Sequence, residues 1–308
     1  MSSAFRVTQR SITTSTMKGL QANQTRMQQL QEQLSSGRQV NRPSDSPVKT
    51  VEAMQFRGTL SRTEQYVRNA DDGIALLNAA DSALSGSVEL TRRVRELTLQ
   101  GMNGSVNAQG REAIALEIDG LRDGLLALAN TRYLDRPVFG GNTGGASAYG
   151  TSADGTPGGK FVGDTGTAVR TVAAGTQVEV NVAGPAAFGD GTGEQLFDVL
   201  RGLSAKLRGE TGAPGGVTDL GDGLSKLDRA TERIIGALGT VGARMNRVEA
   251  ARTRAEDQRV TVTNSLSEVE SIDLPKTIME LQMQEVAYKS ALGATARVVQ
   301  PSLLDFLR

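Results

Sequence analysis

Residues 241–269, VGARMNRVEAARTRAEDQRVTVTNSLSEV, contain the clearest repeat in the chain. Positions spaced alternately four and three residues apart carry an apolar side chain at seven of nine places. These positions are Val241, Met245, Val248, Arg252, Ala255, Arg259, Val262, Leu266 and Val269. This is the heptad spacing of coiled coils, in which a stripe on each helix packs against a partner. The stretch therefore predicts a helix of about 50 residues that needs a second helix to cover its stripe.

A second helix with the same spacing is predicted to begin at Pro47, because Ser46 is a good N-cap and proline is tolerated at the first helical position. Only Thr63 and Asp81 interrupt its stripe, and Gly101-Met-Asn-Gly104 ends it. The stripe consists of Phe56, Leu60, Val67, Ala70, Ile74, Leu77, Leu84 and Val88. Antiparallel pairing of residues 47–102 with residues 218–270 would bury both stripes.

Two shorter helices are predicted near the ends of the chain. One ends near Gly37 and is rich in glutamine, and the other restarts after Asp273, with Pro275 in its first turn. A short polar helix is marginal alone and is stabilised by a partner. Both are therefore expected to form an assembly interface, with each other or with neighbouring subunits. The predicted interface residues are Leu20, Met27, Leu30, Leu34, Leu274, Ile278, Leu281, Tyr288, Leu292, Val299, Leu303, Leu304 and Phe306.

The middle of the chain has a different composition. Residues 140–223 hold 22 of the 36 glycines and carry a net charge of −4, whereas residues 1–60 carry +5. Alternating β-branched residues at 169–172 and 176–182 predict a hairpin that turns at Ala173-Ala-Gly175. Short helices are predicted after Gly193 and up to Asn130.

These patterns together predict an α+β fold: a long antiparallel coiled-coil bundle with an inserted Gly-rich, mainly β middle domain. The expected segments are an N-terminal assembly helix and loop, the two halves of the helical core around an outer domain, and a C-terminal assembly helix. Their ranges are 1–46, 47–140, 141–217, 218–274 and 275–308.

Composition excludes several chemistries. The 308 residues include no Cys, His or Trp, and 34 basic residues balance 34 acidic ones. These absences exclude zinc sites that need Cys or His, Ser-His-Asp and Cys-His nucleophile pairs, and disulfides. The neutral chain also lacks the basic stripe with which a protein would bind nucleic acid. No apolar run is long enough for membrane insertion. The sequence predicts no cofactor, no metal and no catalytic residue.

One enzymatic alternative stays open at this point. Ser46-Pro-Val-Lys49 matches the S-x-x-K pattern of penicillin-binding enzymes, although the companion motifs are absent and an N-cap accounts for Ser46. An enzyme using carboxylates or a Ser–Lys pair in the Gly-rich domain would need a concave pocket lined by groups with shifted pKa values.

The loop between the first two helices resembles a family signature. Residues 34–47, LSSGRQVNRPSDSP, are similar to the signature loop of bacterial flagellins and their junction relatives. Residues 130–141, NTRYLDRPVFGG, resemble the family's passage from its N-terminal helices into its variable middle. Residues 238–249, LGTVGARMNRVE, resemble the start of its long C-terminal helix.

Residues 284–292 and 296–307 complete a resemblance that covers about 1–141 and 225–308. Family members usually carry a more acidic bend where this chain has Ser271-Ile-Asp-Leu274, which is a departure. The ending SLLDFL at 302–307 resembles the hook–filament junction members more than the flagellins.

The resemblance implies a structural subunit that joins the hook-associated region to the flagellin filament, through coupled folding and polymerisation of its terminal helices. These helices would be disordered in the free monomer. A flagellin, which forms the filament itself, is the alternative. The implied partners are copies of the chain, the first hook-associated protein, flagellin, the flagellar type III export apparatus and an export chaperone.

The resemblance also changes the expected location. The lack of a signal peptide by itself predicts a cytosolic protein. Family members instead reach the outside of the cell through the flagellar export apparatus without a cleaved signal peptide. The expected location is therefore the extracellular flagellum.

Overall fold

A computed structural model describes residues 9–151, 160–190 and 195–299. The chain divides into two compact units, and each is described by itself. The central unit comprises residues 62–259, and the terminal unit comprises residues 1–61 and 260–308. The five-segment division expected from the sequence stays a prediction.

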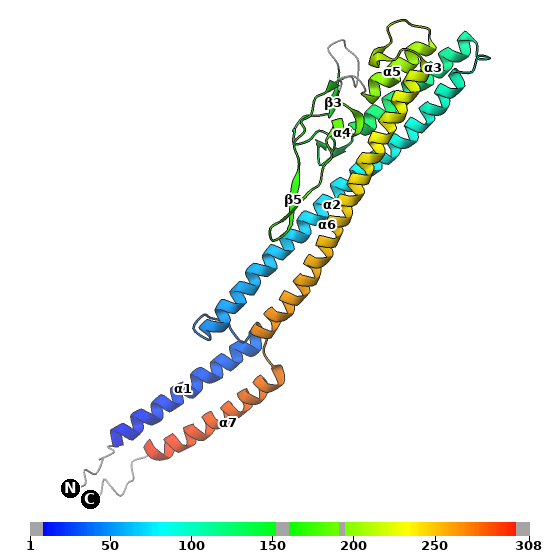
Figure 1. The fold of residues 1–308 in the computed structure, drawn as a ribbon. Helices are drawn as coiled ribbons and strands as arrows, with labels where there is room; N and C mark the ends of the chain where they lie inside the picture. The colour runs from blue at the N-terminus through cyan, green and yellow to red at the C-terminus, as the bar shows by residue number, and fades with distance from the viewer. Residues whose placement is uncertain (1–8, 152–159, 191–194, 300–308) are drawn as a thin grey trace, which may run out of the picture. The chain divides into compact units, whose positions relative to one another are not determined.

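The central unit is built on long antiparallel helices (Figure 1). It contains most of α2 (Pro47–Gly101) and α6 (Leu220–Glu270), together with α3 (Ala108–Ala129). Two ion pairs join α2 to α6: Arg95 with Asp228 (2.9 Å) and Asp71 with Arg252 (2.6 Å). The earlier residue of α2 pairs with the later residue of α6, so the two helices run in opposite directions. The predicted antiparallel helix pair is confirmed.

The buried stripe of α2 differs slightly from the predicted one. Ala80 is fully buried in place of Asp81, and Ser87 is fully buried in place of Val88. Gly73, seven residues before Ala80, is also buried, and a Cβ at Gly73 would lie 3.0 Å from a methyl group of Val180. Small residues occupy these positions because other elements approach the α2 backbone closely. A prediction based on large apolar residues therefore places the buried stripe one position away, as at Val88.

The middle of the chain forms short antiparallel hairpins and short helices. The strand pairs are β1 (Arg132–Tyr133) with β2 (Arg136–Pro137), β3 (Tyr149–Gly150) with β4 (Lys160–Phe161), and β5 (Val169–Ala173) with β6 (Thr176–Glu179). The helices are α4 (Gly184–Phe188), α5 (Leu196–Leu207) and the 3-10 turn η1 (Pro214–Gly216). The predicted hairpin at Ala173-Ala-Gly175 and the predicted helix after Gly193 are confirmed.

Aromatic side chains fill the core of this middle region. The rings of Phe139 and Phe188 meet edge to face at 5.2 Å, and Tyr149 lies at the same centroid distance from Phe197. Tyr149 is almost fully buried, and its hydroxyl donates a hydrogen bond to the carbonyl oxygen of Gly189 at 2.6 Å. Burial raises the pKa of Tyr149 well above its ordinary value, so it stays protonated as a donor.

The terminal unit contains α1 (Gln9–Ser36), the beginning of α2, the end of α6, and α7 (Leu274–Val299). As predicted, α2 begins at Pro47, and the Ser46 hydroxyl accepts the backbone N–H of Lys49 at 3.4 Å. The Asp273 carboxylate accepts the N–H of Lys276 at 3.1 Å and so caps α7.

Candidate assembly interface

The first and last described helices pack against each other within the terminal unit (Figure 1). Gln284 of α7 donates to the backbone and side-chain oxygens of Asn23 in α1 at 3.2 and 3.1 Å. Arg26 forms an ion pair with Glu280 at 3.3 Å. Because the α7 partners move back along the chain as the α1 positions advance, the two helices are antiparallel.

The packed face of α1 agrees with the predicted stripe. Leu30 is 2 % exposed, and Leu20, Met27 and Leu34 are half-buried. The less exposed positions of α1 follow the four-and-three spacing of a coiled coil. They are Thr16, Leu20, Asn23, Met27, Leu30 and Leu34, with Gln33 half-buried beside them.

The predicted stripe of α7 divides between two faces of the helix. Leu281 and Tyr288 are half-buried, whereas Leu274, Ile278 and Leu292 are 53, 44 and 44 % exposed. The less exposed positions include Thr277, Leu281, Gln284, Tyr288, Ala291 and Thr295, which follow the same spacing with many polar residues, and Glu280 and Glu285 beside them are also half-buried. The expectation of one continuous apolar stripe on α7 is corrected in this respect.

Four predicted residues cannot be assigned to either face. Val299 is the last residue of α7, and its side chain is outside the described part. Leu303, Leu304 and Phe306 also lie outside the described residues.

The exposed side of α7 carries further apolar residues that the sequence reasoning missed. Met279, Met283 and Val286 are 58, 59 and 64 % exposed and follow one another at spacings of four and three. That spacing is visible in the sequence, but it runs beside the predicted stripe. Leu274, Ile278 and Leu292 lie along one side of the helix and Met279, Met283 and Val286 along another, and we call the six residues together the exposed apolar residues of α7.

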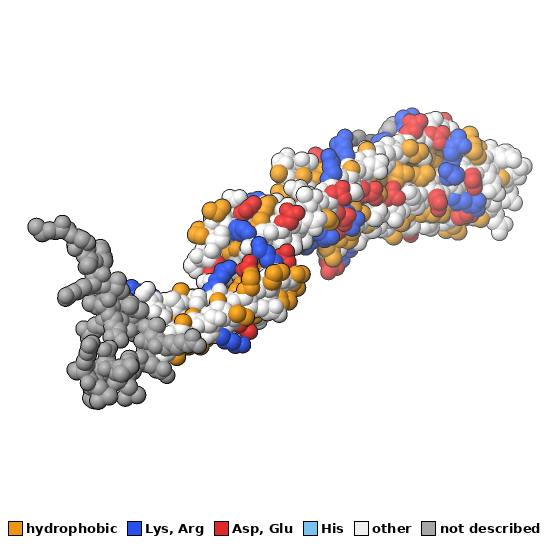
Figure 2. All heavy atoms as spheres, turned by 90° about the horizontal axis from the view of Figure 1, so that it is seen from below, with side chains coloured by type: hydrophobic (Ala, Val, Ile, Leu, Met, Phe, Trp, Pro, Cys, Tyr) orange, Lys and Arg blue, Asp and Glu red, His pale blue; other side chains and the backbone are white. Residues whose placement is uncertain are grey.

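Exposed apolar residues are concentrated in the terminal unit as a whole. Among the described residues, 11 of the 18 exposed large hydrophobic side chains belong to this unit, which is about a third of the chain. Val48, Val51 and Met54 at the start of α2 are 77, 56 and 65 % exposed. Hydrophobic side chains are visible at the surface of this unit in Figure 2. A concentration of exposed apolar side chains of this kind is typical of an interaction site.

Backbone hydrogen bonds join the two linkers of the terminal unit. The N–H of Gln39 donates to the carbonyl oxygen of Glu270 at 2.6 Å, and the N–H of Ile272 donates to that of Gly37 at 3.3 Å. Gly37 has a φ of +69°, a left-handed conformation that suits glycine. The Glu270 carboxylate is largely buried and forms ion pairs with Arg57 at 2.7 Å and Arg38 at 3.8 Å. We call this arrangement the linker clasp.

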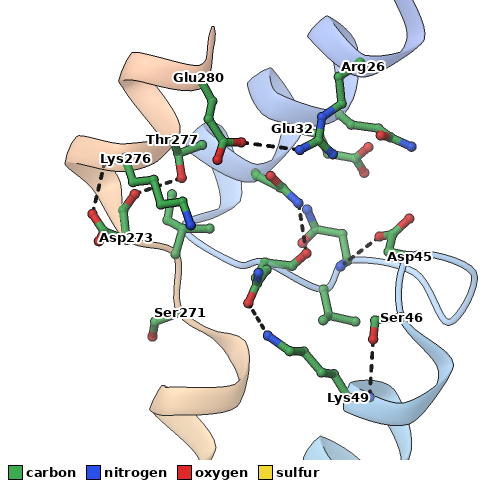
Figure 3. A pocket seen from close by; sticks show the side chains of 16 residues that line it. Arg26, Glu32, Asp45, Ser46, Lys49, Ser271, Asp273, Lys276, Thr277 and Glu280 are labelled. Carbon is green, nitrogen blue, oxygen red and sulfur yellow. Dashed lines mark hydrogen bonds and ion pairs between the residues drawn. The ribbon is translucent and has the colours of Figure 1, made fainter. Parts of the chain in front are cut away.

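A polar cavity of about 470 Å³ lies next to the linker clasp, lined by α1, the 39–46 loop, the start of α2 and the start of α7 (Figure 3). Several of the residues that line it are hydrogen-bonded to one another. Asp45 accepts the backbone N–H of Asn41 and Arg42 at 3.2 and 2.8 Å. The Lys49 ammonium donates to the Gln39 side chain at 2.6 Å. Ser46 and Lys49 therefore act here in helix capping and loop anchoring.

Metal-binding and membrane-spanning features are both lacking in the described part of the chain. The described ranges contain no group of three or more carboxylates placed to hold a metal ion. In residues 9–151, 160–190 and 195–299, no helix combines the length and hydropathy needed to cross a bilayer.

Long antiparallel helices, a small inserted middle region and a terminal helix pair with an exposed apolar face define a helical assembly subunit. Comparison with known proteins agrees with this class. Residues 7–142 match the bacterial flagellin N-terminal helical region, and residues 224–307 match the bacterial flagellin C-terminal helical region. The chain belongs to the bacterial flagellin family, a structural protein family of the flagellum.

Relatives within the family differ in how much of the chain they match. Flagellar hook-associated protein 3 of Escherichia coli K12 is 24 % identical over 298 residues, which cover 90 % of this chain and 92 % of the relative. Polar flagellin F of Vibrio parahaemolyticus is 32 % identical over 105 residues, only 34 % of this chain and 28 % of the flagellin.

A solved structure shares the fold. The flagellar junction protein of Legionella pneumophila is 16 % identical and superposes with a TM-score of 0.57, covering 71 % of this chain and 99 % of that chain. At this level of identity the similarity establishes the shared fold.

Proposed function

We propose that this chain is a structural subunit of the hook–filament junction of the bacterial flagellum. The single observation that carries the proposal is the concentration of exposed apolar side chains in the terminal unit. The full-length similarity to a hook-associated protein 3 supports the junction role over the filament role, because the flagellin similarity covers only a third of the chain.

The mechanism is coupled folding and assembly of the terminal helices. The contact between α1 and α7 mixes polar residues such as Asn23 and Gln284 with apolar ones, and Leu30 is the one hydrophobic residue of the two helices, among those described, that is fully buried. Neighbouring subunits would cover the exposed apolar residues of α7, at a gain of roughly 25 cal/mol for each Å² of apolar surface removed from water. The helix pair therefore depends on assembly for much of its stability.

The interface residues divide into two roles under this proposal. Leu20, Met27, Leu30 and Leu34 hold α1 against Leu281 and Tyr288 of α7. Leu274, Ile278 and Leu292 face neighbouring subunits. Val299, Leu303, Leu304 and Phe306 extend the same interface, and residues 1–46 and 275–308 order as it forms.

The proposed neighbours are copies of this chain, the first hook-associated protein on one side and flagellin on the other. The chain would leave the cell through the flagellar type III export apparatus, with an export chaperone and without cleavage of a signal peptide. This part of the proposal is supported by the family membership and by the sequence motifs at both ends.

Deletion of the gene separates the junction role from the flagellin alternative. Electron microscopy should show bare hooks, with flagellin monomers shed into the medium. Filaments of normal length on the deletion strain would refute the junction role and favour a minor flagellin.

A matched pair of substitutions tests the interface itself. Leu292→Asn removes a 44 % exposed leucine from α7, and Leu99→Asn removes a 45 % exposed leucine from α2 in the central unit. The α7 variant should lose most of its incorporation at hook tips, measured by immunoblotting of purified hooks. The α2 variant should incorporate normally. Equal incorporation of both variants would contradict the assignment of the interface to α7.

A further inference from the structure

The hairpin of β5 and β6 lies beside the two long helices of the central unit (Figure 1). The side-chain amide of Asn69 in α2 donates to the carbonyl oxygen of Thr171 in β5 at 2.8 Å. The Arg244 guanidinium of α6 donates to the carbonyl oxygen of Asn181, just after β6, and pairs with the Glu179 carboxylate. β5 therefore lies next to α2, and β6 lies next to α6.

The outer edge of β6 carries backbone groups that point away from β5. The N–H of Val180 donates to the carbonyl oxygen of Ala168 at 2.8 Å across the hairpin, and inward and outward groups alternate along an antiparallel strand. The N–H and C=O groups of Gln177 and Glu179 therefore point outward. They have no hydrogen-bond partner in the described part of the chain. An open strand edge of this kind is a template for a further strand.

A groove of about 740 Å³ lies between this edge and α6. On the α6 side, Arg247, Ala250 and Arg254 are exposed, and their spacing of three and four residues places them on one face of the helix. Ala251 also lines the groove beside Ala250. The helix rises about 15 Å between Arg244 and Arg254, and β6 extends over about 13 Å, so both walls suit a short extended segment.

The groove is positively charged. Three arginines line it, and Glu179 is the one carboxylate among its described lining residues and is paired with Arg244. Arg247 and Arg254 form no ion pair with any carboxylate of the described residues, and Arg254 donates only to the carbonyl oxygen of Ala250 in its own helix at 3.0 Å. Guanidinium groups with free N–H donors suit carboxylates.

We propose that this groove binds an extended acidic peptide segment of another protein, which adds to the outer edge of β6 as a third strand. Side chains alternate between the two faces of a strand, so apolar ones can lie on the alanines of the groove while carboxylates between them meet Arg247 and Arg254. Main-chain hydrogen bonds to β6 would supply affinity, and the arginines would select for negative charge. This binding is a property of the single subunit and goes beyond the proposed junction role.

Fluorescence anisotropy with labelled synthetic peptides tests the proposal on the full-length chain. The probe is the peptide EVEVEVE, and KVKVKVK is its charge-reversed control. The control should bind the wild-type chain more weakly than the probe by roughly tenfold or more. Arg247→Gln combined with Arg254→Gln should weaken probe binding by roughly tenfold or more, because the charge-assisted hydrogen bonds are lost. Arg92→Gln, at an exposed arginine of α2 outside the groove, should leave it unchanged.

Two further measurements separate strand addition from simple charge attraction. Gln177→Pro removes an outward N–H without removing a hydrogen bond to β5, and should weaken probe binding by roughly tenfold. Gln177→Ala keeps that N–H and should bind as the wild type does. In the wild-type chain, which needs no variant to fold, the bound probe should slow amide hydrogen exchange at Gln177 and Glu179. Exchange at Val169, on the far side of β5, should be unchanged.

Three outcomes overturn the proposal. The first is no binding of EVEVEVE to the wild-type chain. The second is equal binding to the wild type and the double arginine variant, which rejects the groove as the site. The third is unchanged exchange at Gln177 and Glu179 in the bound state, which shows charge attraction without strand addition. Filaments on the deletion strain would refute the junction role but leave these measurements unaffected, so the two failures are distinguishable.

Discussion

The two units of this chain use the same heptad spacing for different purposes. Of the 42 buried hydrophobic residues among those described, 39 lie in the central unit and only Leu30, Ala53 and Val262 in the terminal unit. The exposed large hydrophobic residues show the opposite distribution. The central unit therefore has a core that stabilises it alone, whereas the terminal unit keeps its apolar surface for contacts outside the subunit. A heptad pattern by itself does not reveal which of the two applies.

Removal of the C-terminal segment should give the largest difference between the roles of the two units. Deletion of residues 275–308 should leave the region 47–270 folded, because the core residues of the central unit are retained, and should abolish incorporation at the hook tip. Circular dichroism of the purified variant and immunoblotting of hooks measure the two effects. Normal incorporation of the truncated chain would disprove the division of roles, and full-length protein at equal expression is the control.

The same substitution in the two units should have different consequences. Leu77→Ala, at a fully buried site of α2, should reduce the free energy of unfolding by about 2–5 kcal/mol in urea titrations. Leu30→Ala in α1 should leave the main unfolding transition unchanged and should weaken incorporation instead. A large shift of that transition by Leu30→Ala would show that the two units unfold as one.

Glycine substitutions in helices provide a finer comparison. A methyl group at Gly202 of α5 would overlap the carbonyl oxygen of Pro214, so Gly202→Ala should destabilise by about 1–3 kcal/mol. A methyl group at Gly58 of α2 would have no neighbour within 4 Å, so Gly58→Ala should stabilise its helix by about 0.5–1 kcal/mol. Thermal melts of both variants test the pair, and a loss of stability in Gly58→Ala would indicate a close neighbour there.

The smallest predicted effect depends on pH and concerns the start of α6. The backbone N–H of Thr218, at 3.0 Å, and then the Lys226 ammonium lower the pKa of Asp222 below its ordinary value of 3.8. The carboxylate therefore stabilises the folded state above that value, and this contribution is lost as the pH falls through the lowered pKa. Asp222→Asn should be less stable than wild type at pH 7, and the difference should shrink towards pH 3 in urea titrations.

Most helices could be predicted because periodicity and capping report local geometry. Ser46 and Pro47 fixed the beginning of α2, and the four-and-three spacing from Val241 onward predicted α6. The position of Asn130 as the C-cap of α3 followed from the end of an apolar stripe. These features depend on residues within a few turns of one another.

The details that sequence reasoning missed depend on the approach of distant elements. Ala80 and Ser87 are buried because the other elements of the central unit pack closely on α2, which no local pattern records. In α7, the packed face is defined by Asn23 and the rest of α1, and this leaves Met279 and Met283 exposed. The turn between β1 and β2, formed by Leu134 and Asp135 with positive φ angles, was missed because two-residue turns of this kind usually carry Asn-Gly.

The linker clasp also affects the order in which the parts of the chain can fold. Gln39 is synthesised early, but its hydrogen-bond partner Glu270 is separated from it by most of the chain. Asn23 and Gln284 are separated by 261 positions. Long-range contacts of this kind close late in folding, because a large loop must be ordered before they form. In any process that delivers the chain from its N-terminus, the terminal unit is therefore the last part to be completed, and the subunit becomes competent for these contacts only when nearly all of it has arrived.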